Sequence, residues 1–287
     1  MCLYPRLIPN PKYKKNKKNK GVVPPVWDKR ITFVPIGCQE CMECAKKKMN
    51  EWRVRLGEEI RNNPKKAHFI TLTFSEENLQ KKLDDQSDND FCYQELRLWT
   101  ERIRKVTKKG LRYWFITEKG ENFTERIHMH GIIWTDEKEL ETAREKWTNG
   151  IIDVGWGVSE RTINYLIKYL MKGTEFKSKI WCSNGIGRGY EKRTDAEKNK
   201  FTFKTNKTKE YYTTRQGIKT ALPIYYRNKI YTEDQREMLW VEKLDRMERY
   251  IDGVRIDVST NEGMKLYENI RVCLNFTSLF YYWPSSK

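Results

Sequence analysis

Short apolar runs and amphipathic segments alternate between residues 66 and 174, and this order limits the chain to few folds. Segments rich in β-branched and aromatic residues predict strands at 68–74, 111–118, 126–134 and 151–158. Apolar residues at three- and four-residue spacing predict helices around 96–106, at 136–147 and at 161–172. This β-α-β-β-α-β order predicts an α+β fold. Its four-stranded antiparallel sheet, of RRM or ferredoxin-like type, would carry helices on one face and leave the other open to a ligand.

The pattern divides the chain into three regions. Residues 1–65 hold a basic arm, a cysteine cluster and a helix at 45–61; residues 66–174 form the core; residues 175–287 are a basic loop region and a C-terminal helical extension that packs on the core. Six of the twelve residues 9–20 are lysines, which predicts a mobile arm or an exposed loop. A solvated charge run and phosphate contact explain these lysines equally well. Thr232 and Gln235 form a capping box that predicts a helix over 232–251.

The charge balance of the chain indicates its kind of partner. Lys and Arg number 56 against 39 Asp and Glu, a net charge of +17, which favours an anionic polymer. Apolar residues make up 38% and aromatic residues 13%, so the chain is not of the disordered class. No apolar run approaches the ~18 residues of a membrane span. The N-terminus also lacks the charged-then-apolar order of a secretory signal, so we expect neither a membrane anchor nor export.

The cysteines indicate a reducing compartment, since there are seven of them and three lie within seven residues. Cys38, Cys41 and Cys44 have the Cys-x₂-Cys spacing of zinc ligands. A structural zinc site usually needs four ligands, and Cys2 or His68 could be the fourth. We favour Cys2, because nothing else anchors the N-terminal segment. The alternative is a set of free thiols near the start of a helix.

Two of the three histidines in the chain lie two residues apart on a predicted strand. Because strand side chains alternate, His128 and His130 share one face and Met129 takes the other, toward the helices. Two neutral imidazoles placed in this way can bind one divalent ion. Glu118 ends the preceding strand and could supply a carboxylate ligand, a set that suits Mg²⁺ or Mn²⁺. The alternative is a pair of surface histidines that bind no ion.

The last predicted helix carries two tyrosines and two lysines on one side. At ~100° per residue, Tyr165, Lys168, Tyr169 and Lys172 fall within an arc of roughly 100°, opposite an apolar face. A phenol has a pKa near ~10, and a nearby ammonium or metal ion lowers the cost of forming phenolate. Attack on a phosphodiester would give a phosphotyrosine that keeps the energy of the broken bond. Ordinary core tyrosines, or tyrosines exposed to solvent, are the alternatives.

These residues resemble the HUH endonucleases, the family of rolling-circle replication initiators. His128-Met129-His130 precedes Tyr165 and Tyr169, the order found in replication initiators, and Tyr-x-x-Lys-Tyr-x-x-Lys is similar to the double-tyrosine form of the Microviridae. Further likeness, to gokushovirus-like initiators in particular, lies in the segments 38–44, 69–74, 185–187 and 222–226. In this family an acidic residue before the histidines completes the metal site; Glu118 matches it, with Glu121 and Glu125 as rivals.

The resemblance implies metal-dependent nicking of single-stranded or duplex phage origin DNA. One tyrosine would hold the 5′ phosphate while the 3′ hydroxyl primes synthesis, and the other would cut the regenerated origin and release a circle. It implies action in the cytoplasm of a bacterial host. The dipeptide Gly-Lys occurs nowhere, so no P-loop exists and we expect a host helicase to act in trans.

Two other functions fit part of the pattern. A tyrosine transposase would use the same chemistry, but the double tyrosine and the long basic flanks disfavour it. A non-catalytic binder of single-stranded nucleic acid could use an RRM-like sheet, but such a sheet places aromatic residues on its central strands. This chain has histidines there, which favours the enzyme.

Overall fold

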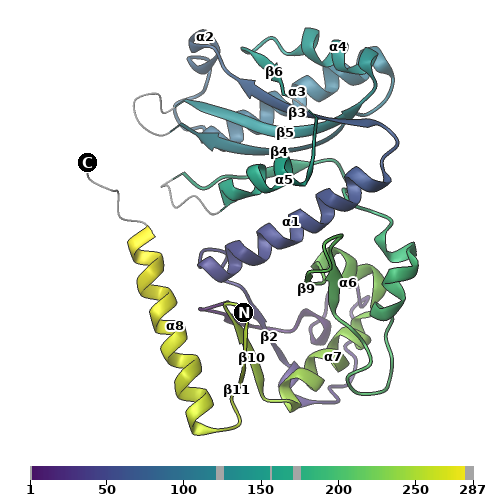
Figure 1. The fold of residues 1–287 in the computed structure, drawn as a ribbon, viewed down its shortest axis with the longest axis vertical. Coiled ribbons are helices and arrows are strands. Elements are labelled where there is room, and N and C mark those ends of the chain that lie inside the picture. The colour runs from purple at the N-terminus through teal and green to yellow at the C-terminus, as the bar shows by residue number, and fades with distance from the viewer. Residues whose placement is uncertain (1, 121–125, 156, 171–175, 282–287) are drawn as a thin grey trace. The chain divides into compact units, whose positions relative to one another are not determined.

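The computed structural model describes residues 2–120, 126–155, 157–170 and 176–281, and these residues form two compact units. The core unit is residues 52–190, and the flanking unit combines the residues up to 51 with those from 191 onward. Helix α1 (Met42–Asn62) contributes its first half to the flanking unit and its second half to the core unit (Figure 1). Each unit is described by itself, and the predicted domain boundaries remain a prediction. No helix within the described ranges is long and apolar enough to cross a membrane.

The core unit is built on one antiparallel sheet of five strands. Its strands, in spatial order, are β6 (Ile152–Val154), β3 (Lys66–Thr73), β5 (Ile127–Thr135), β4 (Arg112–Lys119) and β7 (Ile180–Cys182). The predicted α+β class is confirmed, but the predicted number of four strands is wrong. The extra strand β7 has only three residues, too few to show an alternating pattern, and pairs with the edge of β4 through Trp114 and Cys182. Strand β6 is also shorter than the predicted 151–158.

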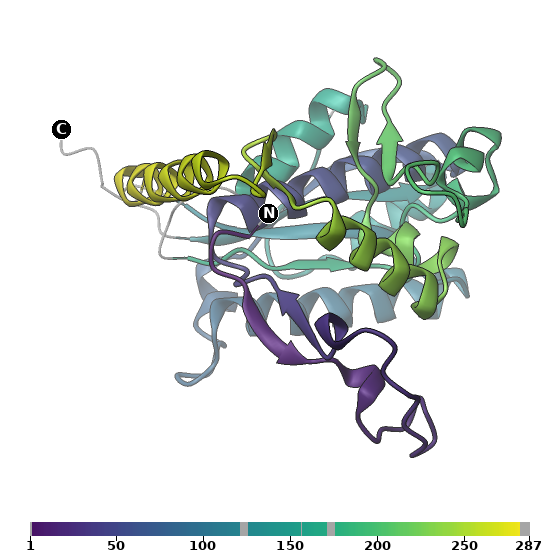
Figure 2. The same ribbon diagram turned by 90° about the horizontal axis from the view of Figure 1, so that it is seen from below.

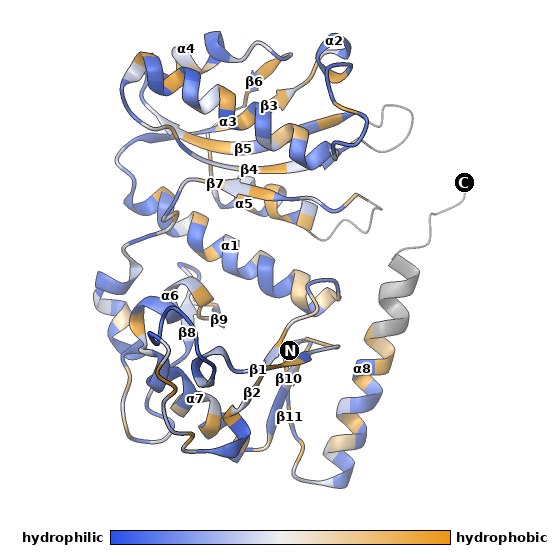
Figure 3. Cartoon of the chain, turned by 180° about the vertical axis from the view of Figure 1, so that it is seen from behind, coloured by the Kyte–Doolittle hydropathy of each residue, from blue (hydrophilic) through white to orange (hydrophobic). Residues whose placement is uncertain are grey.

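Helices α3 and α4 cover one face of this sheet, as predicted. The helices of the core unit are α2 (Glu76–Leu79), α3 (Asp88–Thr107), α4 (Glu137–Lys146), α5 (Glu160–Ile167) and a 3₁₀ turn, η3 (Lys168–Leu170). Trp99 of α3 and Ala143 of α4 are fully buried in one cluster with Met129 of β5. Figure 3 shows apolar residues in orange along β3, β4 and β5, the strands that supply this core. The alternation that predicted the buried side of β5 is therefore correct.

The opposite face is covered, so the prediction of an open face is wrong. The second half of α1 and helix α5 lie on this side, away from α3 and α4 (Figure 1). Trp52 of α1 packs edge-on against Trp114 of β4, with ring centroids 5.7 Å apart. Trp134, on the same strand face as the histidines, is 1% exposed. The sequence did not reveal this cover because α1 precedes the sheet and carries a mixed face of charged and aromatic residues.

A buried ion pair fixes α1 to the sheet. Glu59 accepts hydrogen bonds from Nε and Nη2 of Arg112 at 2.8 and 2.6 Å and from the backbone N–H of Gly187 at 2.7 Å. Gly187 has φ +77°, and a Cβ there would lie 2.5 Å from the Arg55 carbonyl oxygen, so only glycine fits this close approach. Burial alone would raise the pKa of Glu59, but the bonds from Arg112 and Gly187 outweigh it and hold that pKa below its usual value.

The flanking unit contains three two-stranded sheets and three complete helices in its described residues. Its strands are β1 (Arg6–Pro9), β2 (Phe33–Ile36), β8 (Tyr211–Thr213), β9 (Lys219–Ala221), β10 (Glu248–Ile251) and β11 (Val254–Asp257). Its helices are α6 (Ile224–Ile230), α7 (Glu233–Asp245) and α8 (Asn261–Tyr281). Strands β1 and β2 pair antiparallel, and Figure 2 shows them in purple with their connecting residues.

The predicted helix over 232–251 is wrong in its second half. The Thr232 capping box is present, but α7 ends at Asp245 and the chain turns back in the β10–β11 hairpin. Asp252 and Gly253 form the two-residue turn, with φ of +47° and +79°. Asp-Gly between apolar residues is a strong hairpin signal. The four-residue apolar spacing that reaches Ile251 concealed that signal, since it looks the same as the continuation of a helix.

We expect the Glu59–Arg112 pair to dominate the pH dependence of unfolding. In Arg112→Met, Glu59 stays buried without its cation, which costs about 3–5 kcal/mol of unfolding free energy, measured by urea denaturation. Because the pKa of Glu59 is lowered by folding, its stabilisation is full above pH ~4.5 and is lost as pH falls through the folded pKa. This loss on acidification should shrink in the variant. Arg97→Met removes an exposed i,i+4 pair and should change stability by less than about 0.5 kcal/mol; equal effects of the two changes would contradict the assignment.

Candidate functional site

The pairing of β4 with β5 brings two histidines and a glutamate together. Glu118 lies directly opposite His128 across the strands, and His130 follows on the same face. Nε2 of His128 lies 3.2 Å and Nε2 of His130 lies 2.9 Å from the same carboxylate oxygen of Glu118. One ligand atom from each of the three residues lies within 4.8 Å of the others. The structure therefore places the three predicted ligands in one cluster that could hold a metal ion.

The other ring nitrogens of the histidines have partners that orient the rings. Nδ1 of His128 lies 3.2 Å from the carbonyl oxygen of Arg126, and Nδ1 of His130 lies 3.0 Å from Oγ1 of Thr71. A metal-binding histidine usually engages its second nitrogen in this way, which fixes the tautomer and directs the lone pair of the first. With a carboxylate and two imidazoles converging, the donor set fits a divalent cation that prefers nitrogen and oxygen. Glu121 and Glu125, the rival ligands, lie outside the described residues.

Both predicted tyrosines reach this cluster. The Tyr169 ring stacks on the ring of His130, with centroids 5.3 Å apart and 11° between the planes. The hydroxyl of Tyr169 donates to the hydroxyl of Tyr165 at 2.5 Å. Nζ of Lys168 lies 4.1 Å from the Tyr165 ring centroid and 5.4 Å from that of Tyr169. Thus two phenols, one ammonium and the histidine–glutamate cluster meet at one place.

The two tyrosines differ in environment, which the helical projection did not predict. Helix α5 ends at Ile167, and Lys168–Leu170 form the 3₁₀ turn η3, so the predicted continuous helix is wrong at its end. Tyr165 is 42% exposed but Tyr169 only 4%. Burial, followed by its hydrogen bond with Tyr165 and the charge of Glu118, raises the pKa of Tyr169. In the absence of a cation, the structure therefore favours the neutral phenol. Lys172 lies outside the described residues.

Strand β3 supplies two contacts that the sequence analysis assigned no role. Thr71 lies opposite His130 in the β3–β5 register and bonds its Nδ1. Phe69 also stacks against His130, with ring centroids 5.9 Å apart, and packs edge-on against Tyr165. The alternation of residues in 69–73 could have revealed that Phe69 and Thr71 share a face. The sequence alone did not reveal which strand would pair with the histidine strand.

A small pocket borders the cluster at His128. It is lined by Thr73, Phe74, Ser75, Arg126, Ile127, His128, Gly150 and Ile151. A Cβ at Gly150 would lie 2.4 Å from the Thr73 carbonyl oxygen, so glycine permits this close approach of the two backbones. The pocket mixes apolar walls with hydroxyls and one guanidinium, a combination that can accept part of a nucleotide next to the cluster.

The flanking unit holds a second group of potential metal ligands. Cys2, Cys38, Cys41 and Cys44 bring their sulfurs within 4.8 Å of one another. The backbone N–H of Cys38 donates to Sγ of Cys2 at 3.2 Å, and that of Cys41 donates to Sγ of Cys38 at 3.3 Å. Such N–H···S bonds stabilise thiolates, and the pKa of Cys38 is lowered to about 7: burial opposes the shift, and the backbone donors outweigh it. His68, the rival fourth ligand, lies instead on β3 of the core unit.

Comparisons with known proteins concern the region that contains the site. Residues 67–174 match a protein family described as replication-associated proteins of the ORF2 class. The chain is also similar to the replication-associated protein ORF2 of Spiroplasma virus 4, with 26% identity over 240 residues, 70% of this chain and 69% of the relative. No solved structure matches the chain. The matched segment 67–174 includes Glu118, both histidines and both tyrosines.

We expect Thr71 to orient His130 for cation binding. Thr71→Val keeps the size of the side chain but removes the partner of Nδ1, and loss of such a contact typically lowers metal affinity about 10–100-fold. Isothermal titration with Mn²⁺ measures this change. Thr142→Val, on the outer helix α4, removes a hydroxyl bonded to the Lys138 carbonyl and should leave the affinity unchanged. Equal Mn²⁺ affinity in Thr71→Val and the unaltered protein would show that Thr71 plays no such part.

Proposed function

We propose that the protein initiates rolling-circle replication of a phage genome by nicking origin DNA with a tyrosine. One observation carries the proposal: His130 contacts both Glu118 and Tyr169, and Tyr169 is hydrogen-bonded to Tyr165. A cation-binding cluster and two nucleophilic side chains thus share one residue. The similarity to viral replication-associated proteins supports a role in replication initiation, and the site residues supply the chemistry.

The reaction is a transesterification at phosphorus. A Mg²⁺ or Mn²⁺ ion held by Glu118, His128 and His130 would polarise the scissile phosphate and offset the charge that develops on it. A phenol oxygen attacks phosphorus as its proton leaves, the P–O3′ bond breaks, and the 3′ oxygen takes up a proton. The products are a 5′-phosphotyrosine and a free 3′ hydroxyl. Because one phosphodiester replaces another, the strand can later be rejoined without ATP.

The lysines and the second tyrosine have separate roles in this scheme. Lys168 places its ammonium beside both rings, where it favours phenolate and attracts phosphate oxygens. Lys172 is proposed to act in the same way. Tyr165 and Tyr169 would alternate, one holding the 5′ end while the other cuts the regenerated origin. Their hydroxyls lie 2.5 Å apart, close enough to serve one phosphate site in turn.

The cysteine cluster is proposed to bind one structural zinc ion. Four cysteine sulfurs, of which Cys2 comes from the N-terminal segment and the others from the start of α1, form the closed set typical of structural sites. The apolar residues Leu3, Ile251, Ile256 and Val258 pack around them. Bound zinc would thus tie the N-terminal segment to the β10–β11 hairpin and to α1. It would stabilise the flanking unit and take no part in nicking.

The proposed partners follow from the proposed reaction. The substrate is phage origin DNA, single-stranded at the nick and duplex around it, and unwinding would come from a host helicase. The place of action would be the cytoplasm of a bacterial host. The net charge of +17 favours such an anionic polymer.

Covalent trapping tests the tyrosine mechanism. Incubation with single-stranded origin DNA and Mn²⁺ should give a protein–DNA adduct that survives denaturation and gel electrophoresis. Tyr165→Phe/Tyr169→Phe should form none, since it lacks both phenol oxygens, while either single variant should still form some. His128→Ala should also lose the adduct because it loses a cation ligand. Tyr113→Phe, a tyrosine remote from the cluster, serves as the control.

An adduct formed equally well by the double variant would falsify the mechanism. An unaltered protein that binds origin DNA but never forms an adduct would favour the non-catalytic binder. An adduct confined to transposon ends would favour the transposase.

Metal analysis tests the zinc proposal. Purified protein should contain one zinc per chain, measured by mass spectrometry of the metal, and Cys2→Ser should lower this content and the melting temperature of the flanking unit. Cys273→Ser, on the exposed side of α8, should change neither. Zinc-free protein whose four thiols all react with a thiol reagent would instead support the free-thiol alternative.

A further inference from the structure

Residues 11–21, here named the lysine loop, form a compact structure organised by two asparagines. The Oδ1 atom of Asn16 accepts hydrogen bonds from the backbone N–H groups of Lys18 and Asn19 at 2.8 and 3.2 Å. The side-chain N–H₂ of Asn19 donates to the carbonyl of Lys14 at 2.6 Å. Its Oδ1 accepts from the N–H groups of Asn16 and Gly21. The predicted mobile arm is thus a loop with its own internal framework.

The base of the loop is anchored within the flanking unit. Glu237 of α7 accepts a hydrogen bond from Nδ2 of Asn10 at 3.0 Å and one from the hydroxyl of Tyr13 at 3.0 Å. Lys12 turns inward and forms ion pairs with Glu237 and with Asp234, the latter at 2.6 Å. These contacts hold the ends of the loop, so its outer residues are presented on a firm base.

The remaining lysines of the loop carry positive charge that nothing nearby offsets. They are exposed, and within the described part of the chain their side chains form no ion pair; they are Lys14, Lys15, Lys17, Lys18 and Lys20. Other lysines of the flanking unit do have acidic partners, as Lys46 has Asp252 and Lys243 has Glu210. Five like charges in seven residues repel one another, so an organised loop that retains them fits a polyanionic ligand.

We propose that the lysine loop binds the phosphates of duplex DNA, without reading sequence and without the divalent ion. This inference rests on the proposed function, since it assigns the loop to the DNA beyond the nick. Lysine is a point charge with three rotatable donors, suited to phosphate oxygens and poor at recognising bases. Residues 14–20 include no aromatic side chain on which unpaired bases could stack, as proteins that bind single strands usually provide. Duplex DNA offers the densest phosphates, one charge per ~1.7 Å of axis.

The salt dependence of duplex binding tests this proposal. Each phosphate contact on B-DNA steepens the plot of log affinity against log salt by about 0.9, so replacing the five lysines by glutamine should make the slope shallower by about 2–4.5. The probe is a duplex of unrelated sequence, with EDTA present, and fluorescence anisotropy gives the affinity. Replacing the same five lysines by arginine keeps the charge and should retain the slope.

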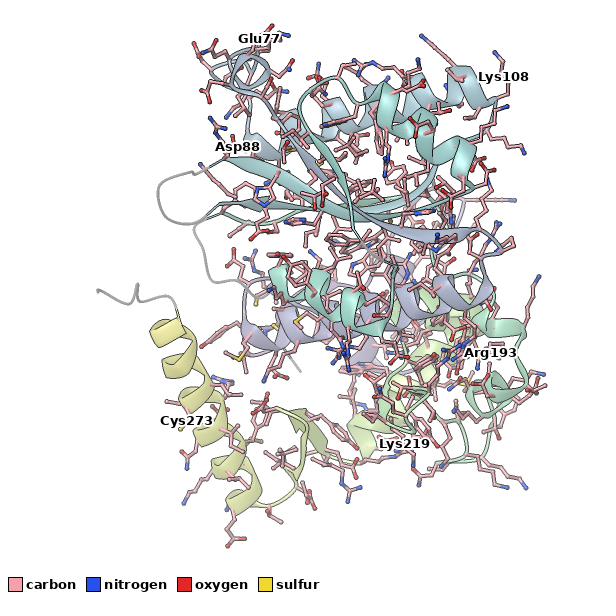
Figure 4. The ribbon with its side chains drawn as sticks, turned by 45° about the horizontal axis from the view of Figure 1, so that its top comes forward. Glu77, Asp88, Lys108, Arg193, Lys219 and Cys273 are labelled. Carbon is pink, nitrogen blue, oxygen red and sulfur yellow. The ribbon has the colours of Figure 1, made fainter. Side chains whose placement is uncertain are left out.

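A matched control carries five Lys→Gln changes elsewhere, at Lys66, Lys105, Lys108, Lys109 and Lys138. These lysines lie at one end of the core unit, and Figure 4 shows Lys108 at the end of α3. The other end of that helix, at Asp88, pairs with Lys119 next to Glu118, and a helix of 20 residues spans ~30 Å. The control lowers net charge equally, and its slope should change by less than about 1.

Two results would overturn the proposal. Equal slopes in the loop variant and the control would show that only total charge matters, and an equal or larger effect on an RNA duplex would show that the ligand is not DNA. The nicking proposal stands or fails separately. The loop variant should still form the covalent adduct on a short single-stranded oligonucleotide, whereas His128→Ala should lose the adduct yet retain duplex binding in EDTA.

Discussion

The register between β4 and β5 is the constraint on which the site depends. It sets Glu118 opposite His128 and leaves His130 on the same face, so that one carboxylate oxygen meets both Nε2 atoms. A slip of one residue would turn both imidazoles toward α3 and α4 and place Met129 at the cluster. The apolar packing of Met129 and Ile133 on that side opposes such a slip. The same hydrophobic alternation that builds the core therefore also fixes the geometry of the cluster.

The second half of α1 connects this sheet to the environment of the tyrosines. Its pair of Glu59 with Arg112 and its contact of Trp52 with Trp114 close the face that carries the histidines. On the same face, Tyr169 is buried against His130 while Tyr165 reaches solvent. In this partly enclosed place a charge interacts more strongly with its neighbours than in water. A cation at the cluster would therefore act strongly on the phenols, and the phenols would in turn be shielded from water.

The sequence predicted the chemistry of the site better than its surroundings. Alternation along one strand placed the histidines together, helical spacing placed the tyrosines together, and cysteine spacing with the position of Cys2 predicted the four-sulfur cluster. Those predictions depend on local periodicity. The cover by α1, the strand β7 and the different burial of Tyr165 and Tyr169 depend on contacts between distant segments, which local patterns do not encode. At Asp252-Gly253 the signal was local, but a competing helical spacing hid it.

The hydrogen bond between the two phenols has a consequence for the timing of events. Once either oxygen becomes part of a phosphate ester, the nearest hydroxyl to that phosphorus is the one that remains. The partially completed reaction would then differ from the resting protein by a single missing proton donor, a difference confined to one pair of rings. A cycle of this kind needs no separate element to register its own progress, because the unmodified ring does so by being alone.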